Sequence, residues 1–514
     1  MKMVKSLLLG SAAGIVAVAG AQAADLPVKA KPVEYVKICS LYGAGYYYMP
    51  GTDICLKLGG YVRYQANIGP GGSISGGPQH GGGGRNTRFA ENEFAHRVRA
   101  LATIDTRQQT AYGTLRSYMM LGWSHDEPTA ASPGLYVSRG FIQIAGFTFG
   151  KATSFFDIYP NASFAYNAGN NWSGDSGDGG VIGMWYTAQF GNGFSGSIGI
   201  EQARRLPSVY THGPTGASLA PIGAAGANPA ANNQGTGAAP SGPSNFPDIV
   251  GNLRLDRSWG TWIVAAALHD VSGGYFGPTL ATSNEAFGHP GQDWGWAVST
   301  GFILNLPMIT PGDRFSVQAV YSQGATAYHA ATRSGAQPLY YKGNQASFGV
   351  WSDAVWAGNT AVNAFELTTA WSIAGAFEHR WTPALKTSWY GSYIDVSYNG
   401  AASALICRSG GAFAAGVIAG GVVPAAPAGC DPDWQAWTAG SRTEWEPVKG
   451  LTFGVDVIYQ QILSANPGQT GTVAGTSLLA PGGGKPATTS STTSAPGRAA
   501  SAFSATSCLD RLSV

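Results

Sequence analysis

The stretch Leu56–Ile68 reads LKLGGYVRYQANI, and apolar and polar side chains alternate along it. Leu58 and Val62 fall on one face, whereas Arg63 falls on the other. A period of two sustained over this length predicts a β-strand. Strands in soluble sandwiches are usually about 5–6 residues long, but a tilted strand that crosses a membrane needs about 9–11. The length of this stretch therefore favours a membrane-spanning strand.

Similar alternating segments recur along the rest of the chain. They lie at 94–107, 110–123, 135–146, 147–157, 181–190, 194–203, 247–258, 260–271, 293–306, 312–323, 365–379, 384–398, 434–447 and 451–460. Together with the first stretch they predict about fifteen strands.

The connections between these segments fall into two classes that largely alternate. Short turns are predicted near Gly146, 191–193, 258–260, 311–312 and 447–450, and long loops at 69–93, 204–246, 324–364 and 399–433. Outer-membrane barrels have tight periplasmic turns and long external loops, whereas soluble sandwiches do not sort their loops in this way. We therefore interpret the Gly- and Ala-rich stretch 223–241 as an external loop rather than a linker between domains.

The composition of the 514 residues excludes several other classes of protein. Charged residues make up 11% of the chain, less than half of the roughly 25% found in soluble domains. A hydrophobic fraction of 44% excludes a disordered chain, and 74 glycines exclude a helical bundle, because each would cost about 1 kcal/mol in a helix. The net charge of +2 argues against binding of nucleic acid.

The N-terminus predicts export. Lys2 and Lys5 precede the apolar run 7–19, and Ala21-Gln22-Ala23 fits a cleavage site, so residues 1–23 are predicted to be a signal peptide. The alternative is a buried helix or membrane anchor, but the run is shorter than the span of about 20 residues that an anchor needs. Residues 24–54 would then form a periplasmic segment that leads into a barrel at 55–489.

Aromatic residues gather near the predicted strand ends, as expected for two aromatic belts at the membrane surfaces. They are Trp294, Trp296, Trp381, Trp389, Tyr390, Trp434 and Trp437. The aromatic core of a soluble β-protein would look similar locally.

Five cysteines occur, at Cys39, Cys55, Cys407, Cys430 and Cys508. In an exported protein pairing is the default, and local pairing predicts the disulfides Cys39–Cys55 and Cys407–Cys430. Spacing alone does not fix the connectivity, and Cys508 is left over. None of the five has the spacing of metal ligands.

Two N-terminal segments also carry a family resemblance. Tyr42-Gly43-Ala44-Gly45-Tyr46-Tyr47-Tyr48 and the segment Pro50–Arg63 resemble the opening of the general porins of rhizobial and related alphaproteobacterial outer membranes. Residues 140–150 are similar to the fourth and fifth strands of those porins, and the resemblance extends to about Gln460. It implies a sixteen-stranded barrel of the porin type, a homotrimer, and a diffusion channel narrowed by the third external loop. The expected surroundings are outer-membrane lipid and lipopolysaccharide.

Five arginines on neighbouring strands share the face opposite the lipid-facing residues. They are Arg63, Arg97, Arg99, Arg116 and Arg139. A charge on the lipid face would cost about 2–4 kcal/mol near the midplane, so we expect these arginines to line a water-filled lumen. The alternative is that they are solvated arginines on an ordinary polar sheet face.

The loop 157–180 lies where the resembling porins fold their constriction loop inward. It carries Asp157, Asp175 and Asp178, and we expect these carboxylates to face the arginines across the channel. Opposed charges would set up a transverse field that favours small polar solutes. The alternative is that they are exposed aspartates of a Gly-rich loop without a role.

The chain offers little for catalysis. Gly174-Asp175-Ser176-Gly177 resembles the surroundings of a serine-protease nucleophile, but no His and Asp stand in matching contexts. A barrel phospholipase would need a Ser–His dyad that we cannot nominate. We therefore expect no enzyme, no metal site and no cofactor, but an outer-membrane channel for ion and solute transport. The alternative is a structural or adhesive barrel whose long loops bind a surface partner.

The end of the chain departs from the porin pattern. Bacterial single-chain barrels have even strand numbers, yet residues 490–514 show low complexity and no ten-residue alternation. They also lack the terminal aromatic that porins present to the barrel assembly machinery. Ser501–Ser507 equals a one-base-shifted reading of a porin-like ending, which indicates a frameshift; the alternative is a genuinely divergent tail. Open edges on the first and fifteenth strands would make the protein an assembly-defective porin variant.

Overall fold

The structure is a computed structural model that describes eighteen segments of the chain. They are 37–68, 94–127, 134–158, 163–166, 171–177, 179–204, 209–210, 246–272, 285, 291–330, 339–342, 345–348, 351–356, 365–408, 431–465, 469–472, 489–492 and 504–509. The predicted signal peptide, Asp178, Cys430 and the side chain of Cys407 lie outside the described residues. The chain divides into two compact units, Met1–Leu56 and Lys57–Val514. Within the described segments, no helix has both the length and the apolar character needed to cross a membrane.

The first unit is held by a disulfide. Cys39 and Cys55 are bonded, as predicted, and both are buried together with Tyr46. The short helix η1 (Ser40–Tyr42) and the strand β1 (Tyr47–Tyr48) lie between the two cysteines. In β1, Tyr48 pairs with Cys55, where β2 begins.

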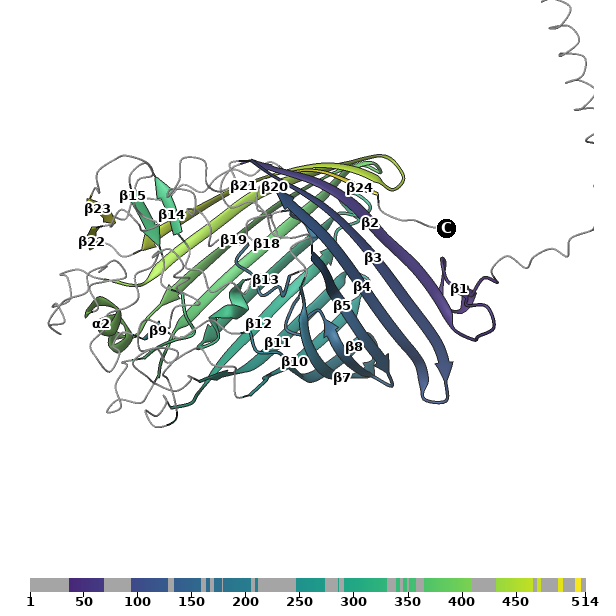
Figure 1. The fold of residues 1–514 in the computed structure, drawn as a ribbon, viewed down its shortest axis with the longest axis horizontal. Coiled ribbons are helices and arrows are strands. Elements are labelled where there is room, and N and C mark those ends of the chain that lie inside the picture. The colour runs from purple at the N-terminus through teal and green to yellow at the C-terminus, as the bar shows by residue number, and fades with distance from the viewer. Residues whose placement is uncertain are drawn as a thin grey trace, which may run out of the picture. The chain divides into compact units, whose positions relative to one another are not determined.

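The second unit is built on one antiparallel sheet whose strands are neighbours in chain order (Figure 1). The strands are β2 (Cys55–Ile68), β3 (Phe94–Thr110), β4 (Gly113–Glu127), β5 (Gly134–Ile144), β6 (Phe147–Ala152), β7 (Val181–Gly191), β8 (Phe194–Glu201), β10 (Asp248–Arg257), β11 (Gly260–Val271), β12 (Asp293–Asn305), β13 (Arg314–Gln323), β18 (Thr369–Thr382), β19 (Leu385–Ser397), β20 (Trp434–Val448), β21 (Leu451–Ala465) and β24 (Ser504–Leu509). The first fifteen confirm the predicted strands. The main boundary difference is β6, which was predicted to continue to residue 157 but ends at Ala152.

The two faces of the sheet have the composition expected of a barrel in lipid. In β13, Phe315 and Tyr321 are exposed, whereas Ser316, Gln318 and Ser322 are buried at 0–1% exposure. Apolar residues thus point outward, and polar residues point inward, which reverses the arrangement of a soluble sheet.

Short connections join alternate pairs of strands, as predicted. In the turn between β5 and β6, Ala145 and Gly146 both have positive φ (50° and 86°), and Asn192 and Gly193 repeat this between β7 and β8 (49° and 70°). Two central residues with positive φ match the right-handed twist of a hairpin, so the tight turns set the register of the strands they join.

The long connections carry the remaining described elements. They are β9 (Val209–Tyr210), η8 (Thr326–His329), β14 (Leu339–Lys342), β15 (Gln345–Phe348), β16 (Ala354–Trp356), β17 (Phe365–Leu367), α2 (Gly400–Arg408), β22 (Gln469–Thr472) and β23 (Thr489–Thr492).

The end of the chain contains a short closing strand. No ten-residue alternating strand was predicted within 490–514, and the six-residue β24 lies there and pairs with β21 on one side and with β2 on the other. Strand pairing uses backbone N–H and C=O groups, which do not depend on an alternating side-chain pattern. The alternation test therefore missed a strand of six residues.

The aromatic prediction holds in part. Trp294, Trp381 and Trp389 are 42–54% exposed on the outer face. Trp434 is completely buried and packs against Trp172 with ring centroids 5.6 Å apart. Trp434 therefore belongs to the interior rather than to an aromatic belt.

Candidate channel constriction

The third long connection, residues 153–180 between β6 and β7, is called L3 below. Its Trp172 N–H donates to Ser392 Oγ of β19 at 2.9 Å, and its Asn171 side-chain oxygen accepts from Thr438 of β20 at 3.0 Å. When the pairing is followed from strand to strand around the barrel, β19 and β20 lie opposite β6 and β7. L3 therefore crosses the interior of the barrel.

Residues 163–166 of L3 are fastened to β20 and β21. The Tyr166 N–H donates to Asp456 at 2.6 Å, and its hydroxyl donates to Glu444 at 2.7 Å. The Arg442 guanidinium donates to the Ser163 carbonyl at 2.5 Å. Main-chain and side-chain groups both hold this segment against the wall.

The space for Tyr166 is made by a glycine. A Cβ at Gly454 of β21 would lie 2.0 Å from the Tyr166 hydroxyl oxygen, so any side chain there would displace the Tyr166 ring. The wall and L3 are therefore fitted to each other at this point.

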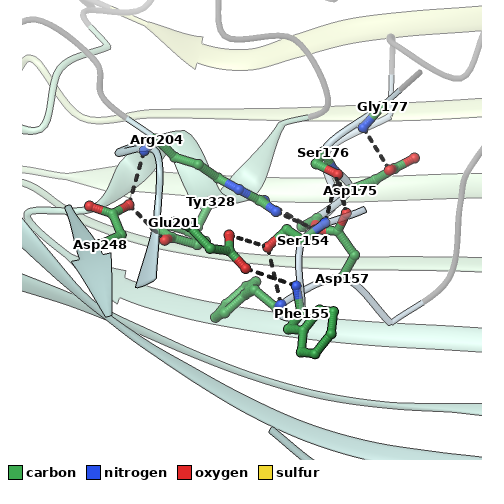
Figure 2. Close-up of polar contacts among 12 residues, drawn as sticks. Ser154, Phe155, Asp157, Asp175, Ser176, Gly177, Glu201, Arg204, Asp248 and Tyr328 are labelled. Carbon is green, nitrogen blue, oxygen red and sulfur yellow. Dashed lines mark hydrogen bonds and ion pairs between the residues drawn. The ribbon is translucent and has the colours of Figure 1, made fainter. Parts of the chain in front are cut away.

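The two ends of L3 are fastened near β8 by a second set of polar contacts (Figure 2). The Arg204 guanidinium forms an ion pair with Asp157 and donates to the Gly174 carbonyl at 3.3 Å. Asp157 also accepts from the Ser176 N–H at 2.8 Å and from the Ser176 hydroxyl. Arg204 thereby joins the beginning of L3 to its returning segment.

Glu201, the last residue of β8, binds the start of L3. Its carboxylate accepts from the Ser154 hydroxyl at 2.7 Å and from the Phe155 N–H at 2.9 Å, as Figure 2 shows, and from the Trp185 indole N–H at 2.9 Å. Glu201 is 1% exposed, so these hydrogen bonds replace the water that the carboxylate has lost.

Asp248, the first residue of β10, extends the same set of contacts. It accepts from the Arg204 N–H at 2.9 Å, from the Tyr328 hydroxyl at 2.7 Å, and contacts the His269 ring nitrogen Nδ1 at 2.7 Å. Burial and the Asp248 carboxylate raise the pKa of Tyr328 well above its usual value, so its phenol stays protonated and keeps donating.

Three of the predicted pore arginines pair with groups on a neighbouring strand. Arg97 pairs with Asp126 at 2.5 Å, Arg116 with Asp105 at 2.8 Å, and Arg99 donates to Ser124 at 2.9 Å. The arginine side chains of the two ion pairs are 12% and 26% exposed. Arg63 is also half-buried, on β2.

The fifth predicted arginine reaches L3. The Arg139 guanidinium donates to the Gly177 carbonyl at 3.0 Å, so the β5 wall and the returning segment of L3 are in contact. The structure thus brings a predicted wall residue to the predicted loop.

Two of the predicted acidic residues, Asp157 and Asp175, lie in the described part of L3. Asp157 binds Arg204, and Asp175 accepts from the Gly177 N–H at 2.8 Å within its own turn. Asp178 lies outside the described residues, and the opposition of these carboxylates to the wall arginines stays a prediction.

Two carboxylates that pair with the wall arginines were missed by sequence reasoning, although a signal for them exists. The tight turn after Thr110 pairs it with Gly113, and this register places Arg97 directly opposite Asp126. Counting back from the turn would have identified the pair. For Arg204, which stands in an irregular segment, no sequence pattern provides such a signal.

A further group of charges lies on the inner wall near the tip of L3. Glu378 is fully buried and pairs with Arg314 at 3.2 Å and with Lys386 at 3.1 Å. Lys386 also pairs with Glu444 at 3.0 Å. This network fixes the position of Glu444, which in turn binds Tyr166.

A cavity of about 430 Å³ lies between L3 and the wall. Most of the residues that line it are polar in type, and they are Thr153, Ser154, Phe155, Asp157, Ile158, Thr187, Gln189, Gly193, Ser195, Ser197, Asn252, Arg254, Asp256 and Ile263. Among the described side chains, no cluster of three or more His, Cys, Asp or Glu residues has the arrangement of a metal site.

Comparison with known proteins identifies the family. The sequence profile described as Porin subfamily matches residues 25–478. The chain belongs to this porin family. Porin Omp2b of Brucella neotomae is similar to it, with 29% identity over 364 residues, which are 63% of this chain and 86% of that protein. Porin Omp2b of Brucella melitensis is 32% identical over 275 residues, which are 50% of this chain and 64% of that protein.

A solved structure supports the fold of the porin. The outer membrane channel DcaP of Acinetobacter baumannii is similar with a TM-score of 0.52 at 12% identity, over 90% of this chain and 99% of that chain. The family match and this shared fold confirm the family resemblance seen in the sequence and the sixteen-stranded barrel. The porin is an integral β-barrel of the outer membrane.

Proposed function

We propose that the porin forms a water-filled channel through which small hydrophilic solutes and ions diffuse passively, without chemistry. The observation that supports this most directly is L3, which crosses the interior and is hydrogen-bonded to the wall at both Trp172 and Tyr166. A loop held in this way would narrow the lumen, so pore width and polar lining would decide what passes.

The site residues extend this proposal. Arg97, Arg99 and Arg116, with Asp105 and Asp126, provide a charged wall on the inner face of β3 and β4. Because these side chains stay partly exposed, they can act on a passing ion through a screened but sizeable field. Asp157, through its ion pair with Arg204, also holds L3 in shape.

The assembly is part of the same proposal. We expect a homotrimer embedded in outer-membrane lipid and lipopolysaccharide and inserted by the barrel assembly machinery. The short strand β24 supplies the pairing that the edges of β2 and β21 need within the hydrocarbon layer.

Planar-bilayer recording of the refolded protein tests the function. We expect stepwise, ohmic conductance increments and swelling of porin-containing liposomes in a small neutral sugar. A folded barrel that gives neither would overturn the channel and favour a structural or adhesive barrel.

Heat-modifiable bands in outer-membrane preparations test the assembly. Bands at the trimer position support the proposed homotrimer. Recovery of degraded monomer alone would contradict it and would show that β24 does not close the barrel well enough.

A further inference from the structure

We propose that Arg204 is the positioning residue that sets the width of the channel at L3 and couples L3 to the sixth long connection. That connection, residues 324–368, is called L6 below. The inference rests on the proposed channel function, because width has meaning only for a channel.

The first step is the place of Arg204 in the chain. It lies three residues beyond Glu201, where β8 has ended and the fourth long connection has begun. Its side chain therefore reaches L3 from another external loop, whereas Arg442 reaches L3 from within a strand. The position of L3 thus depends on a segment just beyond the end of β8, which is itself held to β10 through the Arg204 N–H and Asp248.

The second step is what Arg204 contacts in L3. It pairs with Asp157 near the start of the loop and donates to the Gly174 carbonyl near its return. These two points lie on opposite limbs of L3, so one guanidinium holds both limbs together. Arginine suits this role because its planar donors can serve two acceptors in different directions.

The third step is the contact with L6. The Arg204 guanidinium carbon lies 4.8 Å from the ring centroid of Tyr328, which belongs to η8 in L6. The same tyrosine donates to Asp248, which also accepts from the Arg204 N–H. The Arg204 side chain therefore contacts both L3 and L6, and its main-chain N–H is bound by Asp248 of β10.

The fourth step is burial. The side chains of Arg204 and Asp157 are 1% and 3% exposed. Burial alone would lower the pKa of Arg204, but the nearby Asp157 carboxylate and its other acidic neighbours raise it instead. The guanidinium is therefore charged, and its removal would leave the Asp157 carboxylate buried without its cationic partner.

The experiment compares Arg204→Gln with the matched control Arg257→Gln, which changes an exposed arginine beside the short turn after β10. Trimers that match the wild type in heat stability are taken into liposomes and planar bilayers. The readout is the rate of entry of a neutral trisaccharide relative to a monosaccharide, together with open-channel current noise.

We expect Arg204→Gln to raise the trisaccharide ratio by roughly twofold or more, because pore diameter governs size selection, and to raise the current noise. Arg257→Gln should leave both unchanged. Arg204→Lys, which keeps the charge but has fewer donors, should recover part of the change. A wild-type ratio and wild-type noise in assembled Arg204→Gln trimers would overturn the proposal.

A second variant keeps the test decisive if Arg204→Gln does not assemble. Tyr328→Leu removes the ring and hydroxyl from L6 but leaves the pair of Arg204 and Asp157 intact. It should shift the ratio and the noise in the same direction by a smaller factor, and wild-type values would overturn the proposal. If the wild type itself gives no conductance, the channel function fails; if it conducts and the variants match it, only the role of Arg204 fails.

Discussion

Two arginine–aspartate pairs of this porin have similar chemistry and different surroundings. Arg204 and Asp157 are 1% and 3% exposed at the root of L3, whereas Arg116 and Asp105 are 26% and 11% exposed on the wall. A buried pair is costly to break because each charge has lost its water, but a pair that water reaches can lose a partner cheaply. The comparison teaches that exposure separates charges that hold the channel in shape from charges that act on its contents.

The largest expected effect comes from breaking the buried pair. Asp157→Ala leaves the Arg204 guanidinium buried without its carboxylate, and we expect a loss of about 3–5 kcal/mol in the free energy of unfolding. Asp105→Ala, the matched change on the wall, should cost about 1 kcal/mol because Arg116 stays partly hydrated. Urea unfolding of the refolded proteins in lipid measures both, and equal losses would remove the distinction.

The second effect concerns a buried group without an opposite charge. Burial lowers the pKa of His329, in L6, to about 3 from an ordinary value of 6.5. Below pH 6.5 the unfolded chain takes up a proton that the folded chain refuses, so stability falls as pH falls from 6.5 towards 3. Between pH 7 and pH 4.5 we expect this proton uptake to lower the free energy of unfolding by roughly 2 kcal/mol.

The control for His329 is a change that removes its titration. His329→Gln should lower the stability at pH 7 but flatten its decline under acid, measured as unfolding midpoints at the two pH values. An equal acid decline in both proteins would show that other groups account for it.

The third effect probes the tip of L3. Tyr166→Phe removes the hydroxyl that donates to Glu444 but keeps the ring, and the Tyr166 N–H still binds Asp456. We expect a loss of about 1–2 kcal/mol and a modest increase in open-channel noise, since a hydrogen bond to a charged group is lost. A change as large as that of Asp157→Ala would show that the tip, rather than the root, fixes L3.

The smallest effect concerns the partly exposed pair of Arg116 and Asp105 on the wall. Arg116→Gln removes a positive charge from the partly exposed wall without stranding a fully buried partner. The anion-to-cation permeability ratio should fall on the order of twofold at low salt, with unfolding midpoints close to the wild type. Reversal potentials in a salt gradient measure this ratio, and an unchanged ratio would remove Arg116 from the pore lining.

The strands could be predicted because side chains that face lipid are apolar, so apolar residues recur at every second position of a strand. In β11, Val264 and Leu268 face outward and alternate with the buried Ala265 and Ala267. This alternation needs no knowledge of distant contacts. The disulfide Cys39–Cys55 could also be predicted, because its partners lie close together in the sequence.

The root of L3 could not be predicted in the same way. Asp157 and Arg204 stand 47 residues apart, and both lie in irregular segments where no period fixes a direction for the side chain. The pair of Arg97 and Asp126 is an intermediate case. It can be predicted by counting residues back from the turn between the two strands, because that turn fixes their register. The side chains that contact each other can be predicted from sequence only where both residues lie in paired strands whose register is known.

The short strand β24 has a mechanical consequence. In the part of the chain that the structure describes, it joins β2 through the pairs from Arg63 with Cys508 to Ala66 with Ala505, whereas β3 and β4 are paired continuously from His96 to Thr110. Under a pulling force or rising temperature, a hydrogen-bonded ladder separates first where it is shortest. The barrel should therefore open sideways along the seam between β2 and β24, while the rest of the wall is still intact.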